Sequence, residues 1–148
     1  MIRIHVGPAP IDLAAEMTLA EAATGAGAVA TFTGLVRADD GVGTLELEHY
    51  PGATEAALQR VAEEAVARWT LGAATIVHRV GTMAPGERIV FVAAAAAHRA
   101  AALEACAYLI DRLKTDAPFW KRETRGKEAR WVEARDSDAD AAARWDAG

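Results

Sequence analysis

Two short apolar segments, 74–80 and 88–95, constrain the fold of this chain more than any other feature. Apolar runs of this length between turn residues are typical of buried strands. A Pro-Gly pair at 85–86 suits the two central positions of a type II turn between them. An amphipathic pattern precedes the pair at about 55–69, and a second one follows it at about 99–115. The sequence therefore predicts a β-hairpin flanked by two helices.

The same alternation of short strands and helices continues along the rest of the chain. The further predicted elements are a strand at 2–6, a helix at 12–23, strands at 28–36 and 44–50, strands at 119–123 and 130–133, and a short helix at 136–145. We expect the strands at 28–36 and 44–50 to pair antiparallel through the loop at 38–43. The pattern predicts an α+β fold with a mostly antiparallel sheet, hairpins and three main helices.

The composition indicates a single globular domain. The chain has 148 residues and a mass of 15.6 kDa, and no stretch approaches the ~20 apolar residues of a spanning helix. The N-terminus lacks the basic start and long apolar centre of a signal peptide. Cys106 is the only cysteine, which excludes an internal disulfide and a metal site built on several thiolates. We expect one domain over residues 1–148, in the cytoplasm, with Cys106 in the core.

The charge distribution points to one segment of the chain. The formal net charge is −5, which disfavours general binding to nucleic acid, yet eight of the 16 Lys and Arg residues lie in the basic segment 112–135. This segment is either a solvated face with ion pairs or a site for a small anion. All three lysines, Lys114, Lys121 and Lys127, fall within it. Lysine, unlike arginine, loses its proton readily enough to act as a base or nucleophile.

Three more cations lie at expected element ends. His98 and Arg99 stand where a strand gives way to a helix, and the free N–H groups of a helix N-terminus favour anions. A plain surface pair is the alternative there. Arg37 ends an apolar strand, where its guanidinium is suited to a phosphate. No common catalytic or phosphate-loop motif is present, so the residues alone predict an α+β domain with an anion site and a lysine catalyst.

Several separated blocks of sequence resemble one known family. The blocks are Thr31-Phe32-Thr33-Gly34-Leu35-Val36-Arg37, Leu47-Glu48-His49-Tyr50-Pro51-Gly52, His78-Arg79-Val80-Gly81, Ala97-His98-Arg99, Leu113-Lys114-Thr115, Ala117-Pro118-Phe119-Trp120-Lys121-Arg122-Glu123 and Arg130-Trp131-Val132-Glu133-Ala134. In this order they resemble the large, catalytic subunits of molybdopterin synthase, the MoaE family. The resemblance spans nearly the whole chain and implies an α/β-hammerhead-like fold.

The resemblance implies a reaction and two partners. Two sulfur atoms are placed on cyclic pyranopterin monophosphate to give the dithiolene of molybdopterin. The sulfur arrives as a thiocarboxylate on the C-terminal glycine of a small ubiquitin-like subunit, and no cofactor is held permanently. The family also forms a homodimer of large subunits within a heterotetramer. A single, buried Cys106 agrees with a sulfur source outside this chain.

The family's functional positions are carried over residue by residue. By this resemblance the catalytic residues are Lys114 and Lys121, and the substrate-binding residues are Leu35, Val36, Arg37, His98, Arg99, Arg122, Glu123 and Arg135. Arg37, His98 and Arg99 are expected to hold the phosphate, and the two lysines to neutralise the thiocarboxylate and the developing oxyanion. The loop at 38–43 is short and acidic, and alanines follow Arg99 where polar residues are expected, so these two places depart from the family pattern.

Two other functions compete with the enzyme. One is a noncatalytic adaptor that binds a ubiquitin-like tail, which the presence of both Lys114 and Lys121 disfavours. The other is an RNA-phosphate binder that uses the basic segment. The negative net charge disfavours it, as does the lack of a series of exposed aromatics.

Overall fold

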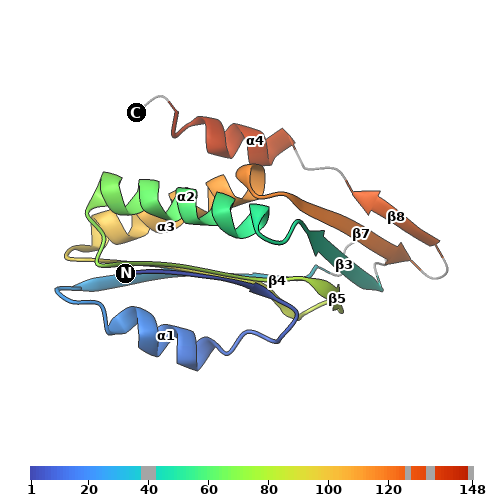
Figure 1. The fold of residues 1–148 in the computed structure, drawn as a ribbon, viewed down its shortest axis with the longest axis horizontal. Helices are drawn as coiled ribbons and strands as arrows, with labels where there is room; N and C mark the ends of the chain where they lie inside the picture. The colour runs from blue at the N-terminus through green and yellow to red at the C-terminus, as the bar shows by residue number, and fades with distance from the viewer. Residues whose placement is uncertain (38–42, 126–127, 133–135, 147–148) are drawn as a thin grey trace.

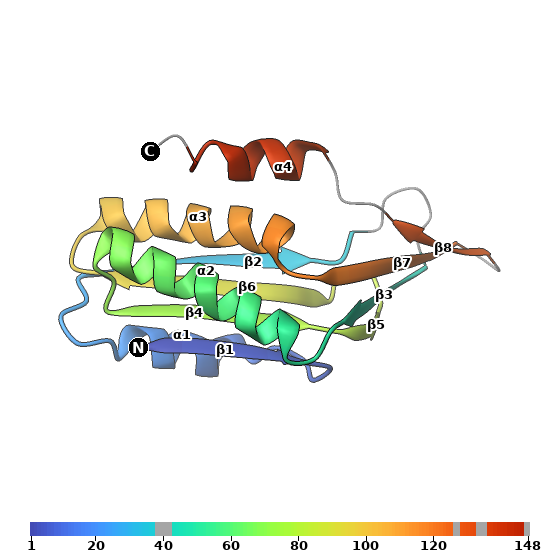
Figure 2. The ribbon, with the colours of Figure 1, turned by 45° about the horizontal axis from the view of Figure 1, so that its top comes forward.

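The computed structural model describes residues 1–37, 43–125, 128–132 and 136–146. Its main sheet, sheet A, has the strand order β1-β4-β6-β2, which Figure 2 shows from the face that carries two long helices. The strands are β1 (Ile2–Gly7), β4 (Ala73–Arg79), β6 (Arg88–Ala96) and β2 (Ala28–Leu35). The central strands β4 and β6 are almost wholly buried, as their continuous apolar sequence predicts.

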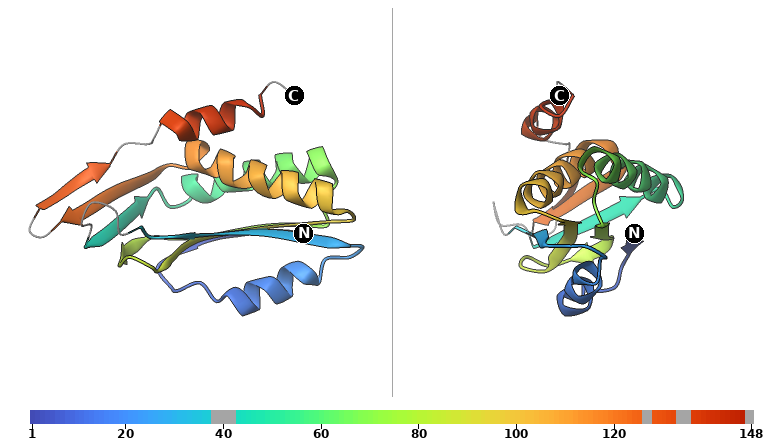
Figure 3. Two further views of the ribbon diagram at one scale, coloured as in Figure 1. Left: turned by 180° about the vertical axis from the view of Figure 1, so that it is seen from behind. Right: turned by 90° about the vertical axis from the view of Figure 1, so that its left-hand side faces the viewer.

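Helices cover both faces of sheet A unequally. On one face lie α2 (Ala53–Trp69) and α3 (Arg99–Asp116), and on the other lies only α1 (Leu13–Glu21), as Figure 1 and the end-on view of Figure 3 show. The main core lies between the sheet and the two long helices and is rich in alanine, so the helix backbones approach the strands closely. Cys106 is buried in this core, as predicted. Desolvation raises the pKa of its thiol to about 11.

A second sheet, sheet B, extends from one end of the molecule (Figure 1). Its strand order is β5-β3-β7-β8, with β5 (Gly81–Met83), β3 (Thr44–His49), β7 (Phe119–Arg125) and β8 (Glu128–Val132). All three pairings in sheet B are antiparallel. A small apolar cluster of its own supports it at the junction with sheet A.

The α+β class and the mainly antiparallel pairing are confirmed. The predicted hairpin is present, since β4 and β6 pair antiparallel, and Gly86 has the positive φ of 91° that the third position of a type II turn requires. Between them the chain visits sheet B as β5, a detour too short for its periodicity to reveal. Strands β7 and β8 pair as predicted.

One prediction about strand pairing is wrong, and one pairing was not predicted. The strands β2 and β3 do not form a hairpin: β2 pairs with β6 in sheet A, whereas β3 pairs with β5 and β7 in sheet B. In addition, β1 joins the sheet by a parallel pairing with β4. Both differences arise because strand partners are chosen by burial among distant segments, which local periodicity does not report.

The C-terminal helix α4 (Asp136–Ala143) lies over α3. An aromatic cluster fixes the turn that follows it: Trp145 contacts Trp69 and Tyr108 edge to face, with ring centroids 5.7 and 5.6 Å away. The guanidinium of Arg68 lies over all three rings, between 4.9 and 5.9 Å from their centres. Within the described part of the chain, every helix is too short or too polar to cross a membrane.

Candidate functional site

The two sheets meet at an apolar cluster around which several predicted site residues gather. Val36, Leu45, Leu47 and Met83 are buried there, and Phe119 packs against them. These residues come from the segment after β2, from β3, from β5 and from β7. The cluster therefore brings the end of sheet A, which carries Arg37, next to the strand that carries Lys121.

The segment Leu35–Arg37 is aimed by two local features. The register between β2 and β6 shifts between Gly34 and Leu35, a bulge of the kind that redirects side chains at strand ends. Val36 then forms two backbone hydrogen bonds with the turn after β5: its N–H donates to the Glu87 carbonyl at 2.9 Å, and its carbonyl accepts from the Gly86 N–H at 2.8 Å. As a result Val36 is buried, while Leu35 and Arg37 are exposed on either side of it.

An ion pair between Arg79 and Glu87 supports that turn. Arg79 is only 8% exposed. Its guanidinium donates to the Glu87 carboxylate at 3.1 Å and to the Pro8 carbonyl at 3.0 Å. The Glu87 carboxylate also accepts from the Ala84 N–H, closing the turn. Chiefly this hydrogen bond, and then the guanidinium, holds the pKa of Glu87 below its ordinary value.

The two predicted catalytic lysines approach the junction from different elements. Lys114 is exposed in the last turn of α3, where a cation also complements the helix dipole. Lys121 lies on β7 and is half-buried. Its strand partner is the buried Leu47, so its side chain belongs to the face of sheet B that carries Phe119 and the apolar cluster.

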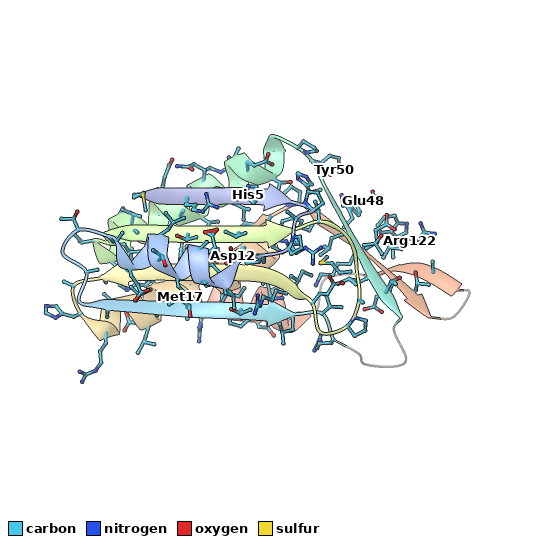
Figure 4. All side chains as sticks on the ribbon, turned by 90° about the horizontal axis from the view of Figure 1, so that it is seen from below. His5, Asp12, Met17, Glu48, Tyr50 and Arg122 are labelled. Carbon is cyan, nitrogen blue, oxygen red and sulfur yellow. The ribbon has the colours of Figure 1, made fainter. Side chains whose placement is uncertain are left out.

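Glu123 shares the face of Lys121, whereas Arg122 does not. By strand alternation Arg122 lies on the outer face of sheet B with Trp120 and Trp131, which are 51% and 54% exposed. Figure 4 shows Arg122 with Glu48 and Tyr50 at this end of the molecule. Within one chain, therefore, Arg122 is separated from the lysine that precedes it by the thickness of the sheet.

His78 is the titratable side chain that sequence reasoning missed. It lies at the end of β4, is 6% exposed, and stacks on Phe119 with ring centroids 4.0 Å apart and an interplanar angle of 22°. Burial chiefly, with smaller contributions from the charges of Lys121 and Lys114, lowers its pKa to about 4. Both lysines thus lie near one buried ring. A histidine inside an otherwise apolar run was the available signal.

His98 and Arg99 lie far from this group. His98 is the N-cap residue of α3 and Arg99 begins the helix, and both are exposed. The helix has 18 residues and is therefore about 27 Å long, with Lys114 near its other end. One chain does not bring the predicted phosphate pair and the predicted lysines together.

Other expectations fall outside the described residues or concern metals. Arg135 and Lys127 lie outside the described residues, as does most of the loop at 38–43. The described ranges contain no group of three or more His, Cys, Asp or Glu side chains arranged to hold a metal ion. What the described geometry offers is two amines beside an apolar cluster, with a guanidinium at the adjacent strand end, an arrangement suited to an anionic group.

Comparisons with known proteins agree on one family. A family model described as "MoaE protein" matches residues 6–116. A curated relative from Salmonella typhimurium, named molybdopterin synthase catalytic subunit, is 51% identical over 146 residues, which cover 97% of each chain. The solved structure of a molybdopterin biosynthesis MoaE protein from Burkholderia ambifaria matches with a TM-score of 0.85 at 47% identity, over 99% of both chains.

A more distant solved structure shares the fold. It is a protein-protein complex of subunits 1 and 2 of molybdopterin-converting factor from Helicobacter pylori, and one of its chains matches with a TM-score of 0.75. The identity is 20%, over 90% of this chain and 91% of the other. At that identity the likeness concerns the fold alone.

Proposed function

The chain belongs to the MoaE protein family, and we propose that it is the catalytic subunit of molybdopterin synthase. Its reaction is the transfer of two sulfur atoms to cyclic pyranopterin monophosphate, which gives molybdopterin. The observation that carries this proposal is the approach of Lys114 and Lys121, from a helix and a strand, to the same junction between the sheets.

The sulfur comes from a partner. Cys106, the only cysteine, is 7% exposed within the α2–α3 core, and its raised pKa keeps the thiol protonated and unreactive. We therefore infer a small ubiquitin-like subunit whose C-terminal thiocarboxylate reaches the lysines.

The lysines act on charge. A thiocarboxylate carries a negative charge, and attack by its sulfur on the substrate develops further negative charge on oxygen. Amines fixed on two rigid elements stabilise that charge without reorganising, which is where catalysis of this type gains most. Lys121 is half-buried beside apolar side chains, so its ammonium interacts more strongly with an anion than a fully solvated one does.

The phosphate group is held across a dimer interface. Because α3 separates His98 and Arg99 from Lys114 of the same chain by about 23 Å along the helix axis, a second copy has to present this pair to the site. A homodimer of large subunits with two composite pockets meets this requirement, and each end then binds one small subunit. Arg37 and Glu123 belong to the lysine half of the pocket, and Arg122 lies on the outer face of the same strand.

The proposal places the reaction in the cytoplasm and gives the chain no permanently held cofactor or metal. The reaction needs a reduced sulfur carrier, which fits the cytoplasm, and it uses the pterin as substrate with no cofactor held permanently. The chain needs no metal of its own for this chemistry, because the charge is balanced by lysine and arginine side chains.

The direct test is reconstitution. The chain is mixed with a thiocarboxylated small subunit and cyclic pyranopterin monophosphate, and the dithiolene product is sought by mass spectrometry. Product that forms only when all three components are present supports the catalytic role. Binding of the small subunit without product identifies an adaptor, and binding of RNA in preference to the pterin identifies a nucleic-acid protein.

A further inference from the structure

His78 is a buried ionisable group at the sheet junction for which the proposed chemistry has no use. Of the other buried polar side chains in the described ranges, Glu16 pairs with Arg3, Arg79 pairs with Glu87, and the threonines carry no charge. Burying an imidazole costs free energy, because water no longer solvates it. Its surroundings therefore need an explanation.

The hydrogen bond of His78 fixes both its tautomer and its orientation. Nδ1 lies 2.8 Å from the carbonyl oxygen of Arg79. Because a carbonyl only accepts, Nδ1 carries the proton, and in the neutral ring Nε2 has none. The bond to the backbone of the next residue prevents the ring from turning about its last side-chain torsion. The imidazole ring of His78 is thus held in one orientation at the end of β4.

The face of the His78 ring packs against the strand that carries Lys121. His78 and Phe119 stack almost parallel, with centroids 4.0 Å apart, although they belong to different sheets. Phe119 is the first residue of β7, and Lys121 follows two positions later on the same face. The ring of His49, from the neighbouring strand, lies 6.4 Å from Phe119 on a tilted plane. The ring at the start of β7 therefore lies near one imidazole from each sheet.

Burial first, and then the neighbouring charges, keep the His78 ring neutral. Lys121 on β7, Lys114 on α3 and His49 on β3 all oppose protonation of His78, in addition to its burial. A charged imidazole would add a third cation beside the two lysines and compete for the anion that they are to bind. A neutral ring supplies packing at this position without that competition.

We propose that His78 is a positioning residue for the sulfur transfer: its ring, fixed by the Arg79 carbonyl, supports Phe119 and so sets where β7 presents the amine of Lys121. This inference rests on the proposed function, since it gives Lys121 a part in the reaction. In this role the end of β4 influences turnover through the position of Lys121.

The test compares a variant that keeps the ring with one that removes it. His78→Phe retains a ring of similar shape, whereas His78→Leu fills the core without one. We expect kcat to fall about tenfold or more in His78→Leu, to recover to within about threefold of the original in His78→Phe, and the pterin KM to change by less than about twofold. The matched control is His5→Leu, at an exposed position of β1 (Figure 4), which leaves kcat unchanged.

A second readout does not depend on turnover. The amines are acylated with a limiting amount of a small reagent, and the ratio of modified Lys121 to modified Lys114 is measured by peptide mass spectrometry. His78→Leu is expected to shift this ratio several-fold, and His78→Phe to restore it. If His78→Leu does not fold, Phe119→Leu removes the other half of the stack and is expected to give the same shift.

The outcomes separate the two proposals. A wild-type chain that makes no product with its partner and substrate overturns the proposed function, while the labelling ratio still tests the role of His78. Wild-type turnover in folded His78→Leu, or a loss of kcat that His78→Phe does not recover, overturns the positioning role and leaves the function intact.

Discussion

His98 and Lys114 stand at opposite ends of one helix, with His98 as the N-cap of α3 and Lys114 in its last turn. The 16 positions between them correspond to about 24 Å along the helix axis, more than a phosphorylated pterin spans. Each proposed pocket therefore draws its lysines from one chain and its phosphate-binding pair from another.

Mixing two defective variants tests this composite pocket. Arg99→Ala is expected to weaken pterin binding, and Lys114→Ala to abolish turnover, each in both pockets of its own homodimer. In a mixed dimer one pocket combines the intact Lys114 of one chain with the intact Arg99 of the other. After subunit exchange in equal amounts, about a quarter of the wild-type activity should return at limiting substrate. No recovery in verified mixed dimers would place both residues in the same chain's pocket.

Lys114→Ala and Lys121→Ala should each reduce product formation at least about 100-fold, because each removes a charge from the developing oxyanion. Folding and binding of the small subunit should be unchanged. Lys114 is exposed in the last turn of its helix, so its loss leaves no cavity. Calorimetric titration with the small subunit and single-turnover mass spectrometry measure the two effects. Full activity in either variant would contradict the role of that lysine.

The Arg79–Glu87 ion pair should influence substrate binding from a distance. Glu87→Ala removes the acceptor that closes the turn at Ala84, and that turn holds Val36 through two backbone hydrogen bonds. The segment before Arg37 then loosens, and we expect the pterin KM to rise several-fold while kcat changes less. Glu87→Gln, which keeps a neutral acceptor, should have a smaller effect. Glu21→Gln, at the exposed end of α1, is the control, and an unchanged KM in Glu87→Ala would refute the link.

Acid should destabilise the protein partly through His78. Its pKa falls from 6.5 in the unfolded chain to about 4 in the folded one. Above pH 6.5 both states are neutral there and His78 contributes nothing to the pH dependence. As the pH falls from 6.5 toward 4, only the unfolded chain takes up the proton, so the free energy of unfolding decreases, by on the order of 3 kcal/mol in total.

Urea unfolding of the wild-type chain and His78→Phe at a series of pH values measures this contribution. The variant should lose less stability between pH 6.5 and 4, while the control His5→Leu, at an exposed position of β1, should follow the wild-type curve. Identical slopes for wild type and His78→Phe would show that the folded imidazole is not held neutral.

Much of the fold was predictable because it follows from the local periodicity of apolar residues. The hairpin of β4 and β6, the amphipathic helices α2 and α3, and the buried Cys106 follow from apolar spacing within about 20 residues. The pairing of β2 and the parallel docking of β1 were not predictable in this way. A strand's own sequence states that it needs a partner but not which distant strand supplies one.

The site was predictable only in its residue types. The basic segment, the scarcity of lysine and the resemblance pointed to Lys114 and Lys121, and the structure brings both near one ring. His78 was not predicted as a site residue because an apolar run normally belongs to the core. The sequence does not show which side chains surround a single polar residue inside such a run. The resemblance places Arg122 among the substrate-binding residues, and strand alternation puts it on the face of sheet B opposite Lys121.

Spacing along the chain specifies which segments are helices and strands, which cations are available, and that the chain's only thiol lies on an apolar face. Those properties depend on neighbours along the chain, and short-range spacing encodes them. The packing of the whole chain settled the rest, namely that β3 leaves β2 for a second sheet and that Phe119 contacts His78. These relationships arise from the packing of distant segments, where burial and shape select among partners that the sequence leaves equivalent.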